Sequence, residues 1–268
     1  MKILVTGANG FLGKKVVFWL KQNGQEVISF GKNICDLEPL PPGIDVVIHL
    51  AAAISGRRRQ IFEKNNILGT QNIVNLSKAA GVKKIIFIST LRVLAKESNL
   101  YIESKKEGEK IIMAAGLPYI ILRPSLLYGP GDKKNIIFLA NLARQIRLAP
   151  VFKFRMQPIF VDDMAEIIRQ SLDLAPDKII NIAGGQTVSH ADFLLSLKEL
   201  GYKFIILNWP RFFSGVLKLV LFMPWLPMPR QQIKTLLADE IYPEYGWQKI
   251  FEIKEKPFKE GLAETLKI

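Results

Sequence analysis

The segment that decides the fold is KILVTGANGFLG, which occupies residues 2–13. A strand-sized apolar run leads directly into a turn with glycine at positions 7, 10 and 13, and a helical pattern opens at Phe11. These glycines let the turn tighten, let the backbone approach a pyrophosphate and let the helix pack on the strand. The free N–H groups and the positive dipole at the helix N-terminus favour phosphate. We therefore expect dinucleotide binding through Gly7, Asn9, Gly10, Phe11, Leu12 and Gly13.

Strand-sized and helix-sized patterns alternate along the first 180 or so residues. Short apolar or β-branched runs predict strands at 2–5, 26–30, 45–50, 84–88, 119–122 and 178–182. Amphipathic stretches of helical length lie between them at 11–22, 67–80, 104–115 and 163–174. This alternation predicts an α/β fold, with a Rossmann-type doubly wound parallel sheet and a smaller C-terminal substrate lobe.

The alternation becomes irregular after about Gly184, which predicts the domain boundary. We expect an NAD(P)-binding domain over residues 1–183, with 129–157 contributing to the substrate lobe. The rest of that lobe is expected at 184–268.

Composition limits the classes of protein that remain. The 268 residues are 49% hydrophobic and 23% charged, which excludes wholesale disorder. A net charge of +13 favours anionic partners, but the basic residues are scattered and only 57–59 form a triple, so no nucleic-acid partner is expected. The single cysteine, Cys35, and an N-terminus without a secretory pattern predict a cytoplasmic protein.

One apolar segment, FFSGVLKLVLFMPWLPM at 212–228, is unusual for a substrate lobe. It is shorter than the roughly 20 residues of a membrane span, and Pro224 and Pro227 interrupt it. We expect a buried or pocket-lining helix, with peripheral membrane contact as the alternative.

The choice between NAD and NADP depends on the residues after the second strand, because an acid there binds the ribose hydroxyls and a base binds the extra phosphate. That strand ends Ser29-Phe30-Gly31-Lys32, with no acid at its tip. Lys32 favours NADP over NAD. Asp36, followed by Leu37, is placed to reach the adenine.

Several further motifs follow the glycine turn in order. They are HLAA at 49–52, NILGTQN at 66–72, IST at 88–90, YIESK at 101–105, LRPSLLYGPGD at 122–132 and PIFVDD at 158–163. Together they cover the chain to about residue 190 and resemble the extended and atypical short-chain dehydrogenase/reductase superfamily, in its NAD-dependent epimerase/dehydratase family. The spacing between Thr90 and Tyr101 is similar to that in the branch of the NADPH-binding accessory subunit of respiratory complex I. The resemblance implies further cofactor contacts from Leu50, Ala51, Ala52, Tyr101, Lys105 and Pro124.

Tyr101 and Lys105 are expected to lie on one face of a helix, because they are four residues apart. The ammonium would lower the phenol pKa from its usual value of about 10, making Tyr101 a general base. Thr90, at the C-terminal end of a strand, would hold the substrate oxygen while the nicotinamide exchanges a hydride. Tyr245 and Lys249 share this spacing but enclose Gly246 and precede no strand, so we expect no catalytic role for them.

The other polar candidates are expected to have structural roles, apart from two arginines. His49 is expected to be a hydrogen-bonded core histidine, and His190 to start a helix. The adjacent Asp162 and Asp163 favour helix capping over a metal pair, and no metal site is predicted. Arg147 and Arg155 are candidates to bind a substrate diphosphate.

These residues together predict an NAD(P)-dependent enzyme that acts on a hydroxyl or carbonyl carbon by Tyr-Lys acid/base catalysis and hydride transfer. It is expected to be either an oxidoreductase or an epimerase, which belongs to the isomerases. Leu91-Arg92 replace the acidic pair that follows the catalytic hydroxyl residue in related sugar-nucleotide dehydratases, which argues against elimination. The substrate is a small molecule, either a nucleotide sugar or a lipidic compound. The alternative is a non-catalytic NADP(H)-binding scaffold or assembly protein like the complex I subunit. A homodimer is compatible with either hypothesis.

Overall fold

The computed structural model describes residues 1–31, 34, 39–56, 58–133, 136–145, 148–207 and 239–267. They divide into two compact units. The first contains Met1–Ser125, Val161–Ala183 and Glu244–Glu255. The second contains the described parts of Leu126–Phe160, Gly184–Pro243 and Lys256–Ile268.

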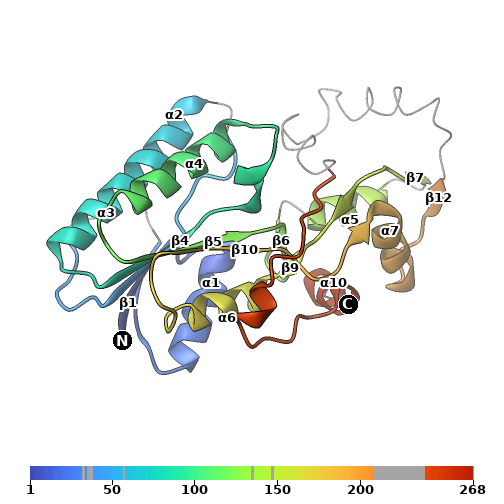
Figure 1. Ribbon diagram of the computed structural model, residues 1–268. Coiled ribbons are helices and arrows are strands. Elements are labelled where there is room, and N and C mark those ends of the chain that lie inside the picture. Colours follow the sequence, from blue (N-terminus) through green and yellow to red (C-terminus); the bar gives the residue numbers. More distant parts are fainter. Residues whose placement is uncertain are drawn as a thin grey trace. The chain divides into compact units, whose positions relative to one another are not determined.

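The first unit contains a six-stranded, fully parallel sheet with the order β2-β1-β3-β4-β5-β10, which confirms the predicted doubly wound fold (Figure 1). Its strands are β1 (Lys2–Thr6), β2 (Glu26–Phe30), β3 (Val46–His49), β4 (Lys84–Ile88), β5 (Tyr119–Pro124) and β10 (Lys178–Ile182). The strand order reverses between β1 and β3, and ligands of doubly wound sheets bind at the carboxyl edge of such a point.

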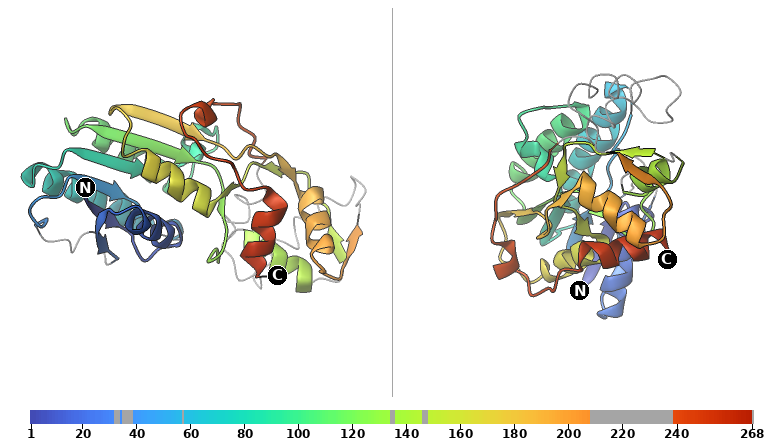
Figure 2. Two further views of the ribbon diagram at one scale, coloured as in Figure 1. Left: turned by 90° about the horizontal axis from the view of Figure 1, so that it is seen from below. Right: turned by 90° about the vertical axis from the view of Figure 1, so that its right-hand side faces the viewer.

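Helices cover both faces of this sheet, so its central strands can be almost wholly apolar (Figures 1 and 2). On one face α1 (Phe11–Gln22) packs against α6 (Val161–Gln170), and α1 buries Gly13, Val16 and Leu20 at helical spacing. The other face carries α2 (Arg59–Phe62), the π-helix η2 (Glu63–Leu68), α3 (Gly69–Ala79), the 3-10 helix η3 (Leu91–Leu94) and α4 (Leu100–Met113).

The predicted strands all exist, with ends shifted by at most two residues, and α1 has the predicted bounds. The helical stretch predicted at 67–80 differs, because the helical backbone begins eight residues earlier, at Arg59. The residues RQIFEKNN at 59–66 contain only two apolar side chains, so they carry no amphipathic period.

The described part of the second unit contains short strand pairs and three helices. Its strands pair as β6 (Leu127–Tyr128) with β9 (Ile159–Phe160), β7 (Leu148–Pro150) with β12 (Ile205–Leu207), and β8 (Arg155–Met156) with β11 (Val188–Ser189). Its helices are α5 (Ile136–Gln145), α7 (His190–Glu199) and α10 (Phe258–Leu266). The core is rich in aromatic rings, including Tyr128, Phe160, Phe193 and Phe258.

The sequence pattern places 184–268 together in a C-terminal lobe, but the structure groups Glu244–Glu255 with the first unit. The reason is Trp247 in the 3-10 helix η5 (Trp247–Lys249), which is 1% exposed. Its indole N–H donates to the Ala183 carbonyl at 2.9 Å, just after β10. The backbone N–H of Glu252 also donates to the Gln170 side chain, at 3.0 Å.

The apolar segment 212–228 and Cys35 lie outside the described residues. Within the described part of the chain, no helix has the length and apolar character needed to cross a bilayer.

Candidate active site

The glycine turn between β1 and α1 is closed by backbone contacts that leave no room for a Cβ at Gly7 or Gly13. Gly7 has φ +69°, in the left-handed region that favours glycine, and the Gly10 N–H donates to its carbonyl at 2.9 Å. A Cβ on Gly13 would lie 2.1 Å from the Gly7 carbonyl oxygen. The sequence therefore needs glycine here to bring α1 against the turn. The turn lies at the carboxyl end of β1, where the strand order reverses.

The carboxyl end of β3 is tied to this turn through His49. Its Nδ1 lies 2.7 Å from Thr6 Oγ1 and its Nε2 lies 3.1 Å from Thr70 Oγ1. The Ala51 N–H donates to the same Thr6 oxygen at 3.3 Å. Burial, with a smaller contribution from the charge of Lys105, lowers the His49 pKa to about 3. His49 is thus a neutral, hydrogen-bonded core residue, as predicted.

Helix α4 carries both Tyr101 and Lys105, one turn apart on the same face. Asn99 caps the helix by accepting a hydrogen bond from the Ile102 N–H at 2.9 Å. Lys105 is only 3% exposed, and its Nζ lies 4.0 Å from the ring centroid of Phe87 in β4. This contact holds the Tyr-Lys face of α4 against the sheet.

The electrostatics of this pair differ from the prediction. Burial raises the pKa of Tyr101 to about 12, with the charge of Arg92 partly opposing it. Burial also lowers the pKa of Lys105 to about 7, with Glu109 partly opposing it. The predicted lowering of the Tyr101 pKa by Lys105 is therefore wrong for this structure. The phenol is desolvated, and the buried amine itself loses much of its tendency to carry a charge.

Thr90 follows β4 at the same carboxyl edge of the sheet. It is 8% exposed and caps η3, because its Oγ1 accepts a hydrogen bond from the Arg92 N–H at 3.3 Å. Leu50, Ala51 and Ala52 follow β3, and Pro124 is the buried last residue of β5. The first unit thus brings the predicted catalytic residues and most predicted cofactor residues to one edge of one sheet.

Asn66 is a buried residue that the sequence motifs contain but that no prediction assigns a role. Its Oδ1 accepts from the Ala53 N–H at 2.7 Å, and its Nδ2 donates to the Ala53 carbonyl at 3.0 Å and to Ser104 Oγ at 2.8 Å. It therefore joins the loop after β3 to α4, beside Lys105. Asn66 lies in the π-helix η2, and π-helical turns are frequent at functional sites. The structure therefore marks Asn66 as a candidate functional residue, but the sequence pattern does not reveal a π-helix.

Five further predicted site residues remain. Lys32, Asp36, Leu37 and Arg147 are outside the described residues. Arg155 belongs to β8 in the second unit, where its guanidinium donates to both carboxylate oxygens of Asp239, at 3.1 and 2.7 Å. The structure thus places Arg155 in an ion pair with Asp239.

The other residues predicted to be structural lie as follows. Asp162 and Asp163 lie in the first turn of α6, and the carboxylate of Asp162 accepts hydrogen bonds from the Lys15 and Trp19 side chains of α1, which are side-chain bonds between two helices and not a helix cap. His190 begins α7 after a capping box formed by Ser189. Tyr245 and Lys249 do not share a helix, because Gly246 adopts a left-handed conformation between them.

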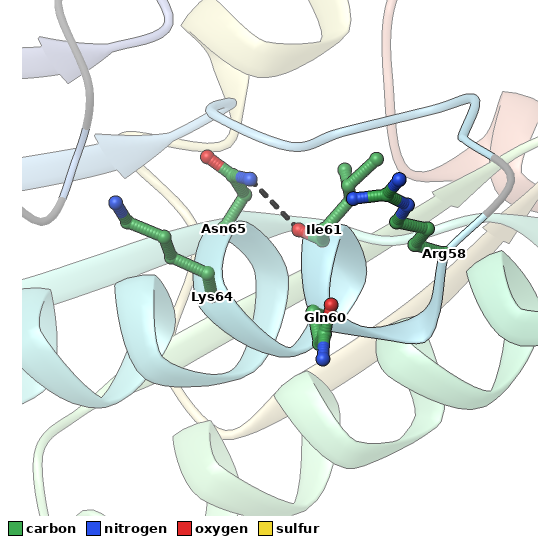
Figure 3. Close-up of a pocket in the computed structure, with 5 residues that line it drawn as sticks. All are labelled: Arg58, Gln60, Ile61, Lys64 and Asn65. Atoms are coloured by element: carbon green, nitrogen blue, oxygen red, sulfur yellow. Dashed lines mark hydrogen bonds between the residues drawn. The ribbon is translucent and has the colours of Figure 1, made fainter.

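A surface pocket of about 550 Å³ lies along α2 and η2 (Figure 3). Its lining residues, none of them a predicted catalytic residue, are Arg58, Gln60, Ile61, Lys64 and Asn65. Across the described ranges, no three histidine, cysteine or acidic side chains gather in a way that would hold a metal ion.

The glycine turn at the strand-order reversal and the Tyr-Lys helix beside it define the class of nicotinamide-dependent Rossmann proteins. The chain belongs to the NAD dependent epimerase/dehydratase family, whose model matches residues 3–183.

Two reductases and one epimerase are among the known proteins that are similar to this chain. Ceramide reductase of Caulobacter vibrioides is 30% identical over 186 residues, which are 61% of this chain and 58% of that protein. The 2-alkyl-3-oxoalkanoate reductase of Stenotrophomonas maltophilia is 28% identical over 55% of this chain and 57% of its own length. The chain thus spans somewhat over half of each of these two relatives. The structure of UDP-glucose 4-epimerase from Thermotoga maritima shares the fold, with a TM-score of 0.75, 20% identity and coverage of 100% of this chain and 98% of the other.

Proposed function

We propose that this protein is an NAD(P)H-dependent reductase that converts a ketone of a lipidic small molecule to the alcohol. The single observation that carries the proposal is the convergence of Thr90, Tyr101 and Lys105 with the glycine turn at one sheet edge. A scaffold needs only the nucleotide-binding turn. Proton donors placed beside that turn favour catalysis.

The residues present fit a dinucleotide. The turn at Gly7 and Gly13 has no space for a Cβ, so side chains there do not separate the backbone at the N-terminus of α1 from a pyrophosphate. Ala51, Ala52 and Pro124 would line the same edge, and Lys105 would hold the ribose. A bound reduced nicotinamide supplies the hydride. Preference for NADP rests on Lys32 and is part of this proposal.

The half-buried Tyr101 is suited to proton donation. A phenol with a pKa raised to about 12 is protonated at neutral pH, so Tyr101 can give its proton to a carbonyl oxygen that gains electron density. The Thr90 hydroxyl would hold that oxygen. Lys105, with its pKa lowered to about 7, can return a proton to the phenol near neutrality. In the oxidative direction the same tyrosine would have to ionise first, which its burial opposes.

The lipidic substrate class is supported by the relatives and by the sequence. Two relatives are named for reduction of a ceramide and of a 2-alkyl-3-oxoalkanoate. The apolar run at 212–228 is suited to lining a lipid site, or to peripheral contact with a membrane.

A second candidate function is epimerisation of a nucleotide sugar. Similarity to a UDP-glucose 4-epimerase over the full length of this chain favours it. Arg147 and Arg155 would then hold the substrate diphosphate. An epimerase uses its cofactor internally and keeps it between turnovers, whereas a reductase exchanges it.

Native mass spectrometry of the freshly purified protein, alone and with NADPH or NADH, tests these candidates together. The proposed reductase is expected without bound nucleotide and to gain one exchangeable NADPH per chain. Retained NAD or NADP would favour the epimerase. Failure to bind any of these nucleotides would contradict both candidates. The same spectra report the oligomeric state, for which we propose a homodimer.

A further inference from the structure

The buried face of α4 carries an acid one turn beyond Lys105. Lys105 and Glu109 are 3% and 4% exposed, and their spacing of four residues places them on the same face of the helix. The Lys105 Nζ lies 4.0 Å from the ring centroid of Phe87 in β4, and a Cβ on Gly108 would lie 2.9 Å from the same ring. The charged residue of β4 itself, Lys84, begins the strand at the opposite edge of the sheet. Little water can therefore reach the face on which the lysine and the acid lie.

The carboxylate of Glu109 is held from the sheet by Arg123 of β5. The Arg123 Nε donates to Oε1 at 2.8 Å and its Nη2 donates to Oε2 at 2.6 Å, which is a bidentate ion pair. The Arg123 Nη1 also lies 3.5 Å from Oδ1 of Asn181, its register partner in β10. The acid beside Lys105 is thus fixed by contacts that involve a helix and two strands.

The groups that face Lys105 from the other elements are neutral or positive. His49 of β3 is neutral, because burial lowers its pKa to about 3. Burial raises the pKa of Tyr101 to about 12, so the phenol is protonated, and the charge that reaches it from Arg92 of η3 is positive. The remaining charged side chains of α4, and those of α2, η2 and α3, are exposed or half-buried. Glu109 is therefore the buried acid of this set, and its charge opposes the fall in the Lys105 pKa that burial causes.

We propose that Glu109 and Arg123 are a positioning pair, which acts through Lys105 by setting how readily this lysine carries the proton that it returns to Tyr101. A carboxylate beside a buried ammonium stabilises the charged form. A guanidinium on the same carboxylate limits this effect, because it offsets part of the negative charge. The role of the pair in the reaction rests on the proposed reductase function, whereas its effect on the charge of Lys105 does not.

The step that the pair would control is a proton transfer without a change in oxidation state. Once the Tyr101 phenol has given its proton to the carbonyl oxygen, the phenolate takes a proton from the Lys105 ammonium. The neutral amine then takes a proton from water. Lys105 can supply this proton only where its ammonium form is populated, so its two charged neighbours set the pH range of the step.

The two partners of the ion pair are expected to have opposite effects. Glu109→Gln removes the negative charge and leaves the guanidinium, so Lys105 should lose its proton at lower pH. Arg123→Gln removes the positive charge and leaves the carboxylate to act on Lys105, which should then lose its proton at higher pH. A pair with a purely structural role would give both variants the same defect, because each substitution breaks the same ion pair.

The test is an NMR titration of Lys105 in the full chain with ¹³C-labelled lysine, whose Cε–Hε signal is assigned by its absence in Lys105→Met. The wild-type midpoint should lie near pH 7. Glu109→Gln should lower it by about one pH unit and Arg123→Gln should raise it by about one pH unit. The control, Glu107→Gln, removes an acid of the same helix that is 45% exposed at its side chain, and should leave the midpoint unchanged.

Shifts in the same direction in the two variants, or an unchanged midpoint in Glu109→Gln, would overturn the inference. If a single variant does not fold, the double variant Glu109→Gln/Arg123→Gln decides, because it leaves neither charge buried alone. Its midpoint should lie below that of the wild type, since Glu109 supports the Lys105 charge in the intact protein, and a wild-type midpoint would contradict the inference. Calorimetry with NADPH separates the two proposals. Opposite shifts without NADPH binding would show that the pair sets the Lys105 charge in a protein that is not the proposed reductase.

Discussion

Each of the two units contains one buried histidine, and the two surroundings differ in kind. His49 in the first unit lies between two threonine hydroxyls that belong to β1 and α3. His190 in the second unit lies among phenylalanine rings, with centroids 4.9 Å away for Phe154 and 5.2 Å for Phe152, and accepts one backbone hydrogen bond. The first unit organises polar groups along the edge of a rigid sheet. The second is held together mainly by apolar packing, so substitutions in the two units should have different consequences.

The largest contrast is expected for two tyrosines of the first unit that share the Tyr-x-x-x-Lys spacing. Tyr101→Phe should lower kcat by roughly 10²- to 10⁴-fold, because it removes the proton donor, and should leave NADPH affinity within a few-fold. Tyr245→Phe, the matched control, should leave kcat unchanged. Steady-state kinetics and calorimetry check both variants. An active Tyr101→Phe enzyme would remove Tyr101 from the acid role.

The next contrast concerns ion pairs, one buried in the first unit and one exposed in the second. Glu109 and Arg123 are 5% and 15% exposed at their side chains, whereas Asp239 and Arg155 are 46% and 55% exposed. Glu109→Ala should lower the free energy of unfolding by about 3 to 5 kcal/mol, because it leaves the Arg123 charge buried without its carboxylate. Asp239→Ala should cause no measurable change, since water screens that pair. Chemical denaturation measures both. Equal losses would contradict the burial argument.

The third contrast compares Gly13 of the first unit, which packs against backbone atoms, with Gly261 of the second unit, which packs against aromatic side chains. A Cβ on Gly13 meets the Gly7 carbonyl at 2.1 Å, whereas a Cβ on Gly261 of α10 meets the Tyr128 hydroxyl at 2.5 Å. Gly13→Ala should weaken NADPH binding on the order of 100-fold, because only a backbone shift can admit the methyl group. Gly261→Ala should cost about 1 to 3 kcal/mol of stability through overpacking and leave cofactor affinity unchanged.

Isothermal titration calorimetry measures the NADPH affinity of Gly13→Ala and of the control variant Gly261→Ala. Binding that is equally weakened in the two proteins would show that general destabilisation is responsible. Wild-type affinity in Gly13→Ala would remove the turn from the cofactor site.

The smallest difference between the two units is expected for their buried histidines, His49 and His190, which should both make the stability of the protein depend on pH. Burial lowers the pKa of His49 to about 3 and that of His190 to about 4, both below the ordinary 6.5. Below pH 6.5 the unfolded chain therefore binds more protons than the folded one, and the free energy of unfolding falls as the pH falls. Each histidine contributes a slope of up to about 1.4 kcal/mol per pH unit between its two pKa values.

Urea denaturation between pH 6.5 and 4.5 checks this dependence. His49→Gln and His190→Gln should each reduce the slope by about one proton's contribution, and the double variant by both. An unchanged slope in either single variant would contradict the buried, neutral state of that histidine.

The sequence predicted the first unit well because long buried strands and a glycine turn have strong local signatures. All six strands were recoverable from apolar runs, and the turn from glycine spacing. The role of Asn66 could not be predicted from the sequence, because it depends on hydrogen bonds with Ala53 and Ser104, two residues that are distant from Asn66 in the chain. The pKa directions at Tyr101 and Lys105 were also missed, because spacing along a helix says nothing about desolvation.

The second unit shows where sequence patterns stop being informative. Its strands are two or three residues long, too short to display an alternation of apolar and polar side chains. The return of Glu244–Glu255 to the first unit depends on one buried indole, Trp247, whose partner is 64 residues away in the sequence. Neither feature has a local signal.

The central claim is that the sheet edge of the first unit binds NAD(P)H and places Tyr101 beside it. Hydrogen–deuterium exchange with and without NADPH tests this claim most directly, because it reports on each unit separately. We predict slower exchange at residues 6–14, at 50–53 and in the first turns of α4, with little change over the described part of the second unit's 126–160. Protection confined to the second unit, or no protection at saturating NADPH and NADH, would contradict the account.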